Sequence, residues 1–247
     1  MIRQQFSHLP EVVKNLLIIN GLFFLATWTL ENQGIDLTKM FALHQFQSPD
    51  FEPWQLITHM FMHDSRSFSH LFFNMLTLWM FGKTLENMWG GKRFLTYYMI
   101  TGFGAALIYV GYIQFQIANI SAELNPELIN QVINATNNTK ISAEPSQFLS
   151  MQKLYDLINV PMVGASGAVY GLLLAFGMLF PNSTIYLLIP PIPIKAKYFV
   201  GGLGILALIS GIGNNPGDNV AHFAHLGGMI FGIILLKYWK KKGDIYF

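Results

Sequence analysis

A serine between glycines and two histidines near the other end of the chain are the residues best suited to catalysis. Ser166 lies in Gly164-Ala165-Ser166-Gly167 and opens an apolar run that continues to Phe180. Glycine lets the backbone turn sharply, so the hydroxyl can be presented for a reaction. A serine hydroxyl becomes a nucleophile when an adjacent base takes its proton. His222 and His225, three residues apart on one helix face, open a second apolar run, and either could be that base.

A further pair of polar side chains could stabilise negative charge in such a reaction. His70 and Asn74 are four residues apart and therefore lie on one face of a helix. The tetrahedral intermediate of acyl transfer needs fixed hydrogen-bond donors, which these side chains and the amide of Ser166 could supply. The sequence offers no Asp or Glu at a matching depth to orient the histidine. The predicted catalytic unit is therefore a Ser-His dyad.

Structural explanations exist for the same residue types. A Gly-x-Ser-Gly sequence in an apolar helix often serves only close helix packing, and Gly228 and Gly232 form a similar pair. His59 and His63 are four apart and could bind a metal ion, but the sequence places no third ligand beside them. A helical transporter or binding scaffold, whose polar groups line a conduction path, is the non-enzymatic alternative.

The composition indicates a membrane protein. Of the 247 residues, 52% are hydrophobic and only 11% are charged, against about 25% charged in soluble domains. A net charge of +2 and the absence of a basic, aromatic-rich patch argue against nucleic acid as a partner. The chain has no cysteine, which excludes disulfides and thiolate metal sites.

Six apolar runs predict membrane spans, because a bilayer core requires about twenty residues of helix. The spans are expected at 12–30, 68–88, 94–116, 163–180, 198–212 and 220–239, with outer connections at 31–67 and 117–161. The aromatic 31–67 connection is expected to fold back into the interface, and the proline-rich 185–194 segment to be extended. The polar 117–161 connection is given no role. We therefore expect one all-α, polytopic domain over 1–247.

Basic residues predict the orientation of these spans. They gather at or just after the ends of the second, fourth and sixth spans, as Lys83, Lys92, Arg93, Lys195, Lys197, Lys237 and Lys240 to Lys242. Such residues favour the cytoplasm, so both termini are expected there. His70, Ser166 and His225 then lie at one common depth, just below the outer surface. Ionisable groups at membrane depth usually mark function, and three converging helices could enclose them in one water-filled pocket.

The order and spacing of these residues resemble the rhomboid family of intramembrane serine proteases. The family's Gly-x-Ser-Gly matches Gly164 to Gly167, and its His-x-x-x-Asn matches His70 to Asn74. Its Ala-His-x-x-Gly-x-x-x-Gly matches Ala224 to Gly232, and the glutamate and glycine that follow the second span appear as Glu86 and Gly90. The resemblance covers all six predicted spans.

The resemblance implies hydrolysis of a peptide bond in or near the transmembrane segment of a single-pass membrane protein. It implies that Ser166 is the nucleophile and that His225, stacked on Tyr170, is the base. His70 and Asn74 would hold the oxyanion. No cofactor and no metal are implied, and the partners would be the lipid bilayer and transmembrane substrates. Because a substrate helix enters laterally, the fifth span and the loop before the sixth are expected to be mobile.

The resemblance also assigns supporting roles. They fall on Gly164, Gly167, Gly228, Gly232, Glu86 and Trp54. One position departs from the family, because the Trp-Arg pair of the first outer connection is here Trp54-Gln55. The loss of that cation is expected to weaken a head-group or structural contact without touching the nucleophile. The short termini favour the inner membrane of a bacterium as the location.

Overall fold

The computed structural model describes residues 9–135, 144–187, 190–213 and 221–245. The elements are α2 (Glu11–Glu31), α3 (Leu37–Phe41), α4 (Gln55–Thr58), η1 (His59–Phe61), α5 (Phe68–Thr77), η2 (Leu78–Gly82), α6 (Lys83–Trp89), α7 (Gly91–Ser121), α8 (Pro126–Ile133), α9 (Phe148–Asn159), α10 (Ser166–Leu179), β1 (Thr184–Tyr186), β2 (Pro193–Lys195), α11 (Ala196–Gly213) and α12 (His222–Lys242). Among these residues, α2, α7 and α11 are long and apolar enough to cross a membrane, and α10 is a shorter apolar helix.

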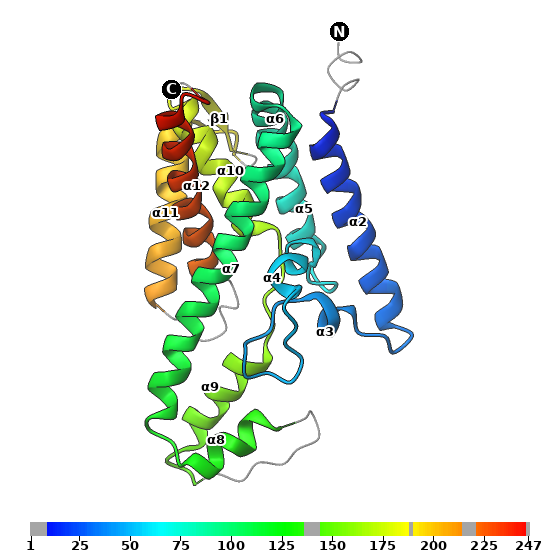
Figure 1. Cartoon of the computed structure of the whole chain (residues 1–247), viewed down its shortest axis with the longest axis vertical. Helices are drawn as coiled ribbons and strands as arrows, with labels where there is room; N and C mark the ends of the chain where they lie inside the picture. The colour runs from blue at the N-terminus through cyan, green and yellow to red at the C-terminus, as the bar shows by residue number, and fades with distance from the viewer. Residues whose placement is uncertain (1–8, 136–143, 188–189, 214–220, 246–247) are drawn as a thin grey trace.

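Helices α7, α10 and α12 pack together at the centre, and α11 covers α10 and α12 (Figure 1). Small residues allow the close approach. A methyl group added at Gly104 of α7 would overlap the ring of Phe231 on α12, and one at Gly171 of α10 would lie 2.7 Å from Thr101 on α7. Because no Cβ atom is present at these places, the helices approach each other closely. Small residues at helix interfaces favour van der Waals packing of this kind in lipid.

The predicted second span is one continuous helical segment, which consists of α5, the π-helical turn η2 and α6. It ends at Gly90, whose φ of 78° suits glycine. The buried carboxylate of Glu86 accepts hydrogen bonds from the backbone N–H groups of Val12, at 2.9 Å, and Val13, at 2.7 Å. The first N–H groups of a helix lack partners within it. Glu86 therefore ties the second span to the first turn of α2.

The helix that carries Ser166 begins later than predicted. The span was expected from residue 163, but α10 begins at Ser166. Met162 forms an antiparallel bridge with Leu43, so the chain before the serine is extended, and Gly164 then takes a φ of 123°. The third span is longer than predicted, because α7 continues to Ser121. Most of the predicted mobile loop before the sixth span, residues 214–220, lies outside the described residues.

The 117–161 connection contains two helices that the sequence analysis did not predict. Leu128 and Val132 of α8 pack with Leu154 and Ile158 of α9. The same cluster includes Ile117, on the part of α7 that extends past the predicted span. The α8–α9 hairpin lies at the end of the molecule opposite the C-terminus (Figure 1). The hairpin and the end of α7 thus form a small second hydrophobic core.

The 31–67 connection folds back against α2 through its aromatic residues. The ring of Phe23 on α2 contacts Phe41 at 5.7 Å and Phe61 at 6.1 Å between centroids. Two short helices, α4 and η1, cover residues 55–61 of this connection.

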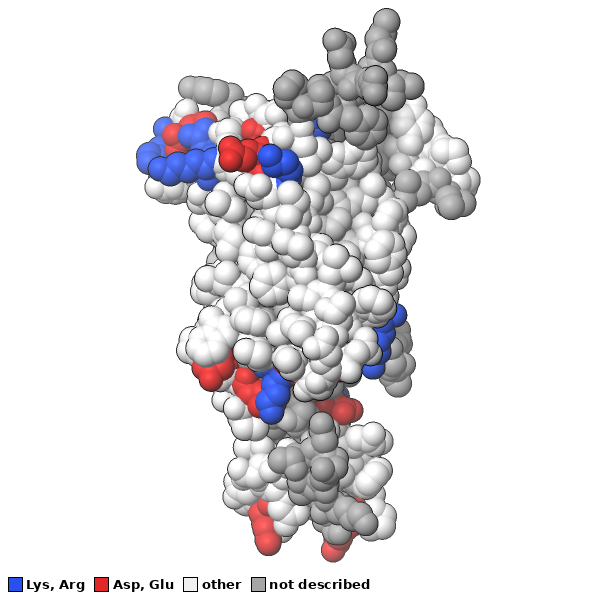
Figure 2. All heavy atoms as spheres, turned by 90° about the vertical axis from the view of Figure 1, so that its right-hand side faces the viewer, with Lys and Arg blue, Asp and Glu red and all other residues white. Residues whose placement is uncertain are grey.

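The fold is mostly helical rather than all-α. Strands β1 and β2 form an antiparallel hairpin in which Ile185 pairs with Ile194. This hairpin occupies the proline-rich segment that was expected to be extended. On the face that Figure 2 shows, charged side chains lie near the top, in a band below the middle and at the bottom of the molecule, and an uncharged belt separates the top group from the band below it. Such a belt is the surface that a bilayer core requires.

Candidate active site

Ser166 is the first residue of α10, and the segment before it is held in place by the backbone. Gly164 donates its N–H to the carbonyl of His59 at 3.0 Å, and Met162 exchanges two hydrogen bonds with Leu43 at 2.8 and 2.9 Å. The positive φ of Gly164 turns the chain from this extended segment into the helix. The serine therefore sits at a sharp, fixed entry to α10.

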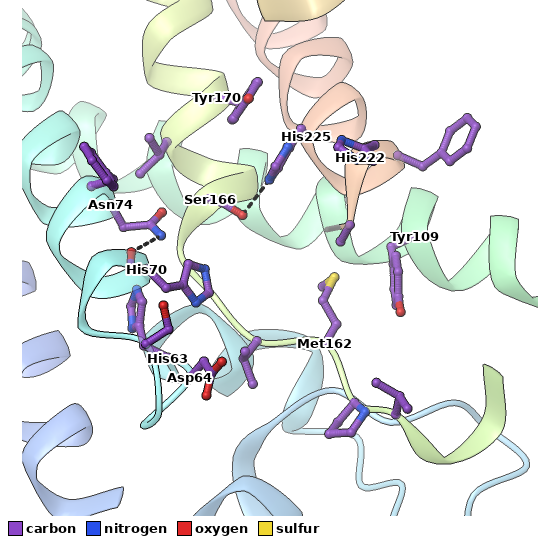
Figure 3. Close-up of a pocket in the computed structure, with 18 of the residues that line it drawn as sticks. His63, Asp64, His70, Asn74, Tyr109, Met162, Ser166, Tyr170, His222 and His225 are labelled. Atoms are coloured by element: carbon purple, nitrogen blue, oxygen red, sulfur yellow. Dashed lines mark hydrogen bonds between the residues drawn. The ribbon is translucent and has the colours of Figure 1, made fainter. Parts of the chain in front are cut away.

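His225 lies in the first turn of α12 with its ring directed at the serine (Figure 3). Its Nε2 is 2.9 Å from Oγ of Ser166. The ring stacks on Tyr170, one turn further along α10, with centroids 4.1 Å apart and planes 6° apart. Among the residues the structure describes, Nδ1 of His225 is buried and has no hydrogen-bond partner. The pair has the geometry of a nucleophile and its base without a carboxylate behind the base.

His222, the other candidate base, lies beside the pair rather than in it. Its ring is edge-on to that of His225, with centroids 6.2 Å apart. The contact with Ser166 is made by His225. The structure thus brings together Ser166 and His225, the pair that the resemblance implies. Helical spacing alone had not distinguished His225 from His222 as the base.

Close packing of α10 on α12 sets the distance between serine and histidine. A methyl group at Gly228 would overlap the carbonyl of Gly167, and one at Gly232 would overlap the hydroxyl of Tyr97. That hydroxyl donates a hydrogen bond of 2.9 Å to the carbonyl of Gly171. Gly228 and Gly232, two of the glycines predicted to have supporting roles, therefore lie where α12 packs closely on α10 and α7.

His70 and Asn74 line the cavity opposite His225 (Figure 3). Asn74 is buried, and its Nδ2 donates one hydrogen bond, of 2.8 Å, to the carbonyl of His70. A methyl group added at Gly164 would lie 2.9 Å from Nε2 of His70 and 3.7 Å from Oγ of Ser166. The imidazole and the hydroxyl therefore flank the same glycine. An amide carries two donor hydrogens, so Asn74 retains one for a ligand.

The cavity holding these groups has a volume of about 1230 Å³ and reaches well beyond them. It is also lined by residues that the sequence analysis did not single out, namely Tyr109, Tyr112, Lys153, Asp156, Leu157 and Val160. Four of these come from α9 and the residue that follows it. The apolar spacing of Met151, Leu154 and Ile158 was the available signal for a helix there.

His59 and His63 are not arranged as a metal site. Within the described parts of the chain, no three possible metal ligands come together. His59 is buried, and its Nδ1 is 2.9 Å from the carbonyl of Gln55. Burial lowers the pKa of His59 to about 4 and that of His63 to about 3. The ring of His63 lies 5.1 Å from that of His70 at the cavity wall.

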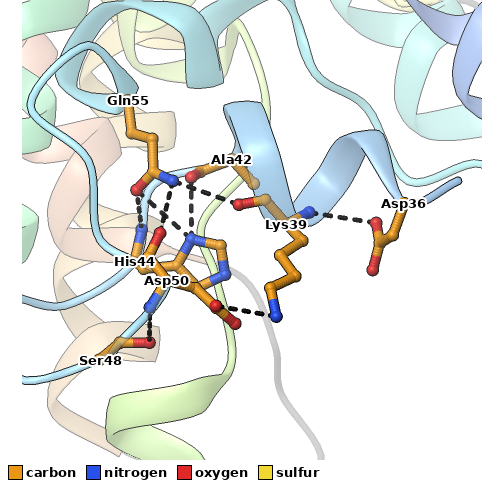
Figure 4. A network of polar contacts seen from close by, with 7 residues as sticks. All are labelled: Asp36, Lys39, Ala42, His44, Ser48, Asp50 and Gln55. Carbon is orange, nitrogen blue, oxygen red and sulfur yellow. Dashed lines mark hydrogen bonds and ion pairs between the residues drawn. The ribbon is translucent and has the colours of Figure 1, made fainter.

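Gln55, which stands where the family has arginine, is a buried centre of hydrogen bonds in the outer connection (Figure 4). Its Nε2 donates to the carbonyls of Asp50, at 2.8 Å, and Lys39, at 3.3 Å. Its Oε1 accepts from the N–H of His44 at 3.2 Å. The neighbouring Trp54 is half exposed and donates its indole N–H to Met40 at 3.0 Å. The expected loss of a structural contact is thus offset by an amide that both donates and accepts.

Comparison with known proteins gives a consistent match. The model of the rhomboid domain matches residues 50–241. Rhomboid protein 1, mitochondrial, of Saccharomyces cerevisiae is 28% identical over 174 residues, which are 68% of this chain and 37% of the relative. RHOMBOID-like protein 12, mitochondrial, of Arabidopsis thaliana is 28% identical over 221 residues, 88% of this chain and 55% of the relative. Rhomboid-like protein 16, chloroplastic, of the same plant is 24% identical over 226 residues, 90% and 60% respectively. The chain thus spans well under two thirds of the length of these relatives.

Proposed function

The chain belongs to the rhomboid family, and on that premise we propose that it is an intramembrane serine endopeptidase acting on the transmembrane segments of single-pass membrane proteins. Many members of this family are serine proteases. The rhomboid domain crosses the membrane several times. The observation that carries the proposal is the 2.9 Å contact between Oγ of Ser166 and Nε2 of His225 inside a large cavity.

The reaction follows from the positions of four side chains. His225 takes the proton of the Ser166 hydroxyl as its oxygen bonds to the carbonyl carbon of the scissile peptide. The resulting oxyanion accepts hydrogen bonds from His70, Asn74 and the amide of Ser166. His225 then gives the proton to the leaving amine, and a water molecule, deprotonated by the same ring, hydrolyses the ester. Stacking on Tyr170 keeps the ring directed at Ser166 through both steps.

The proposal includes six membrane crossings with both termini in the cytoplasm. The crossing segments are α2, the continuous helical segment α5–η2–α6, α7, α10, α11 and α12. The starts of α10 and α12 and the cavity then face the outer side, from which water reaches the dyad. We keep the inner membrane of a bacterium as the proposed location.

A fluorophosphonate probe tests the proposal and separates it from a transporter or binding scaffold. The probe forms a covalent bond with an activated serine and leaves an unactivated one unmodified. We expect one modified peptide, carrying the label on Ser166, and no label in Ser166→Ala or His225→Ala. A folded protein that stays unlabelled under conditions in which an unrelated serine protease reacts would contradict the proposal.

A further inference from the structure

Helix α9 has one face that fixes it to the protein and another that faces the active-site cavity. Met151, Leu154 and Ile158 are buried, and they pack against α8 and the outer end of α7. This spacing of three and four residues defines a single stripe along a helix. The hairpin that α9 forms with α8 is therefore attached to α7 along the length of α9.

The second face of α9 follows the same spacing. Lys153, Asp156, Leu157 and Val160 recur at intervals of three and four residues and line the cavity that contains Ser166. We define these four residues as the α9 stripe. The chain continues from Val160 to the Met162–Leu43 bridge, which fixes the end of the stripe next to the site. The stripe therefore lines the same cavity as Ser166 and ends at the segment that leads into it.

This inference rests on the proposed protease activity. We propose that the α9 stripe is a specificity surface for the extramembrane segment of the substrate next to the scissile bond, and that Asp156 selects a lysine or arginine there. Leu157 and Val160 offer apolar contact to the same segment.

The charged residues that line the cavity are on balance negative even with Lys153 of the stripe counted, and they are Glu31, Asp36, Asp64 and Asp156 against Arg66 and Lys153. Asp156 is exposed to the cavity and has no ion pair in the part of the chain that the structure describes. Desolvation raises the pKa of its carboxyl, and a cation beside it would have the opposite effect. Asp156 also lies in the last turn of α9, where the carbonyl groups carry partial negative charge. By contrast, Asp64 and Arg66, which also line the cavity, are 3.5 Å apart and pair with each other.

Matched reporter substrates test the proposal. Each reporter is a single-pass protein with one lysine or one glutamate among the first six residues outside the cut, and otherwise neutral residues there. We expect the wild type to cleave the best lysine reporter about fivefold faster than its glutamate partner, a typical value for one partly exposed charge pair. Asp156→Asn should remove this preference and Asp156→Lys should reverse it. The preference should shrink in 1 M salt, because screening weakens exposed pairs.

Glu123→Lys is the matched control, because it makes the same charge reversal in the outer connection at an exposed residue outside the cavity. It should keep the wild-type preference, and all variants should react with the fluorophosphonate probe like the wild type. Ser166-dependent cleavage with the same lysine-to-glutamate ratio in wild type and Asp156→Lys would overturn this inference alone. Absence of both labelling and Ser166-dependent cleavage would overturn the proposed function and this inference with it.

Discussion

His225 is positioned by an aromatic ring rather than by a carboxylate. Its Nε2 contacts Ser166, one face of its ring lies on Tyr170, and its Nδ1 has no partner among the residues described. In a triad, a carboxylate on Nδ1 would hold the tautomer and the orientation of the ring. Here the parallel stack at 4.1 Å has to hold the orientation.

Tyr170→Ala should therefore reduce the rate of proteolysis without abolishing it. An aromatic pair contributes about 0.5–1.5 kcal/mol, which corresponds to roughly a twofold to tenfold fall in kcat. Tyr170→Phe keeps the ring and should retain most of the activity. The measurement is kcat on a transmembrane reporter for the three proteins. Equal losses for Ala and Phe would show that the hydroxyl, and not the stack, is what matters.

Replacing Gln55 by the family's own residue, arginine, should destabilise this protein. Arginine has five donors and no acceptor, so it leaves the buried N–H of His44 without its partner. An unsatisfied buried group costs about 1–3 kcal/mol, and we expect Tm in detergent to fall by several degrees. Gln131→Arg, on the exposed face of α8, is the control and should leave Tm unchanged. A Tm for Gln55→Arg at or above the wild-type value would contradict this reading of the loop.

At the scale of the elements, the contact between α10 and α12 decides whether serine and histidine meet. Gly228→Ala places a methyl group on the carbonyl of Gly167. Overpacking of this kind costs about 1–3 kcal/mol, and a displacement of about 1 Å at the site reduces the rate by roughly 100-fold. We expect weaker fluorophosphonate labelling and a lower Tm.

Gly202→Ala on α11 is the matched control, because nothing lies within 4 Å of the added methyl group. It should leave labelling and Tm as they are. Normal labelling in Gly228→Ala would show that the helices can separate without moving Ser166 from His225.

The elements also show where prediction from the sequence succeeds and where it stops. The long helices were located within a few residues, because continuous apolar runs need no knowledge of their neighbours. The start of α10 was missed, because it depends on the bridge between Leu43 and Met162, which joins distant parts of the chain. Helix α9 was missed, because Leu154 and Ile158 are apolar residues in a polar segment and are buried only by α7 and α8.

The candidate site was more predictable than the loops around it. Ser166, His225, His70 and Asn74 stand out as polar groups beside apolar runs, and the resemblance distinguishes His225 from His222. Physical reasoning alone did not assign the base, because both histidines lie on one helix face. The cavity wall formed by α9 could not be predicted, since it requires the path of the chain after α7.

At the scale of the whole molecule, the distribution of charge and the uncharged belt support the proposed orientation in the membrane (Figure 2). The end of α12 carries Lys240, Lys241 and Lys242, whereas α8 lies at the opposite end of the molecule. Positive residues are retained on the cytoplasmic side. In the proposed orientation, the hairpin of α8 and α9 therefore lies on the outer side.

Single cysteines test this orientation without background, because the chain has none of its own. Glu127→Cys should react with a membrane-impermeant maleimide in intact cells, and Lys241→Cys should react only after the membrane is opened. The reverse pattern would invert the topology. Reaction of both in intact cells would mean that the termini and the hairpin share one side.

Cleavage of a single-pass membrane protein is the reaction that the proposed Ser166–His225 dyad has to perform. A purified single-pass reporter is incubated in detergent with the wild type, Ser166→Ala or His225→Ala, and the fragments are identified by mass spectrometry. We expect one cut in or beside the transmembrane segment with the wild type and none with either variant. A cut of equal rate with Ser166→Ala, or an intact reporter with a wild type whose Ser166 is labelled, would contradict the proposed function.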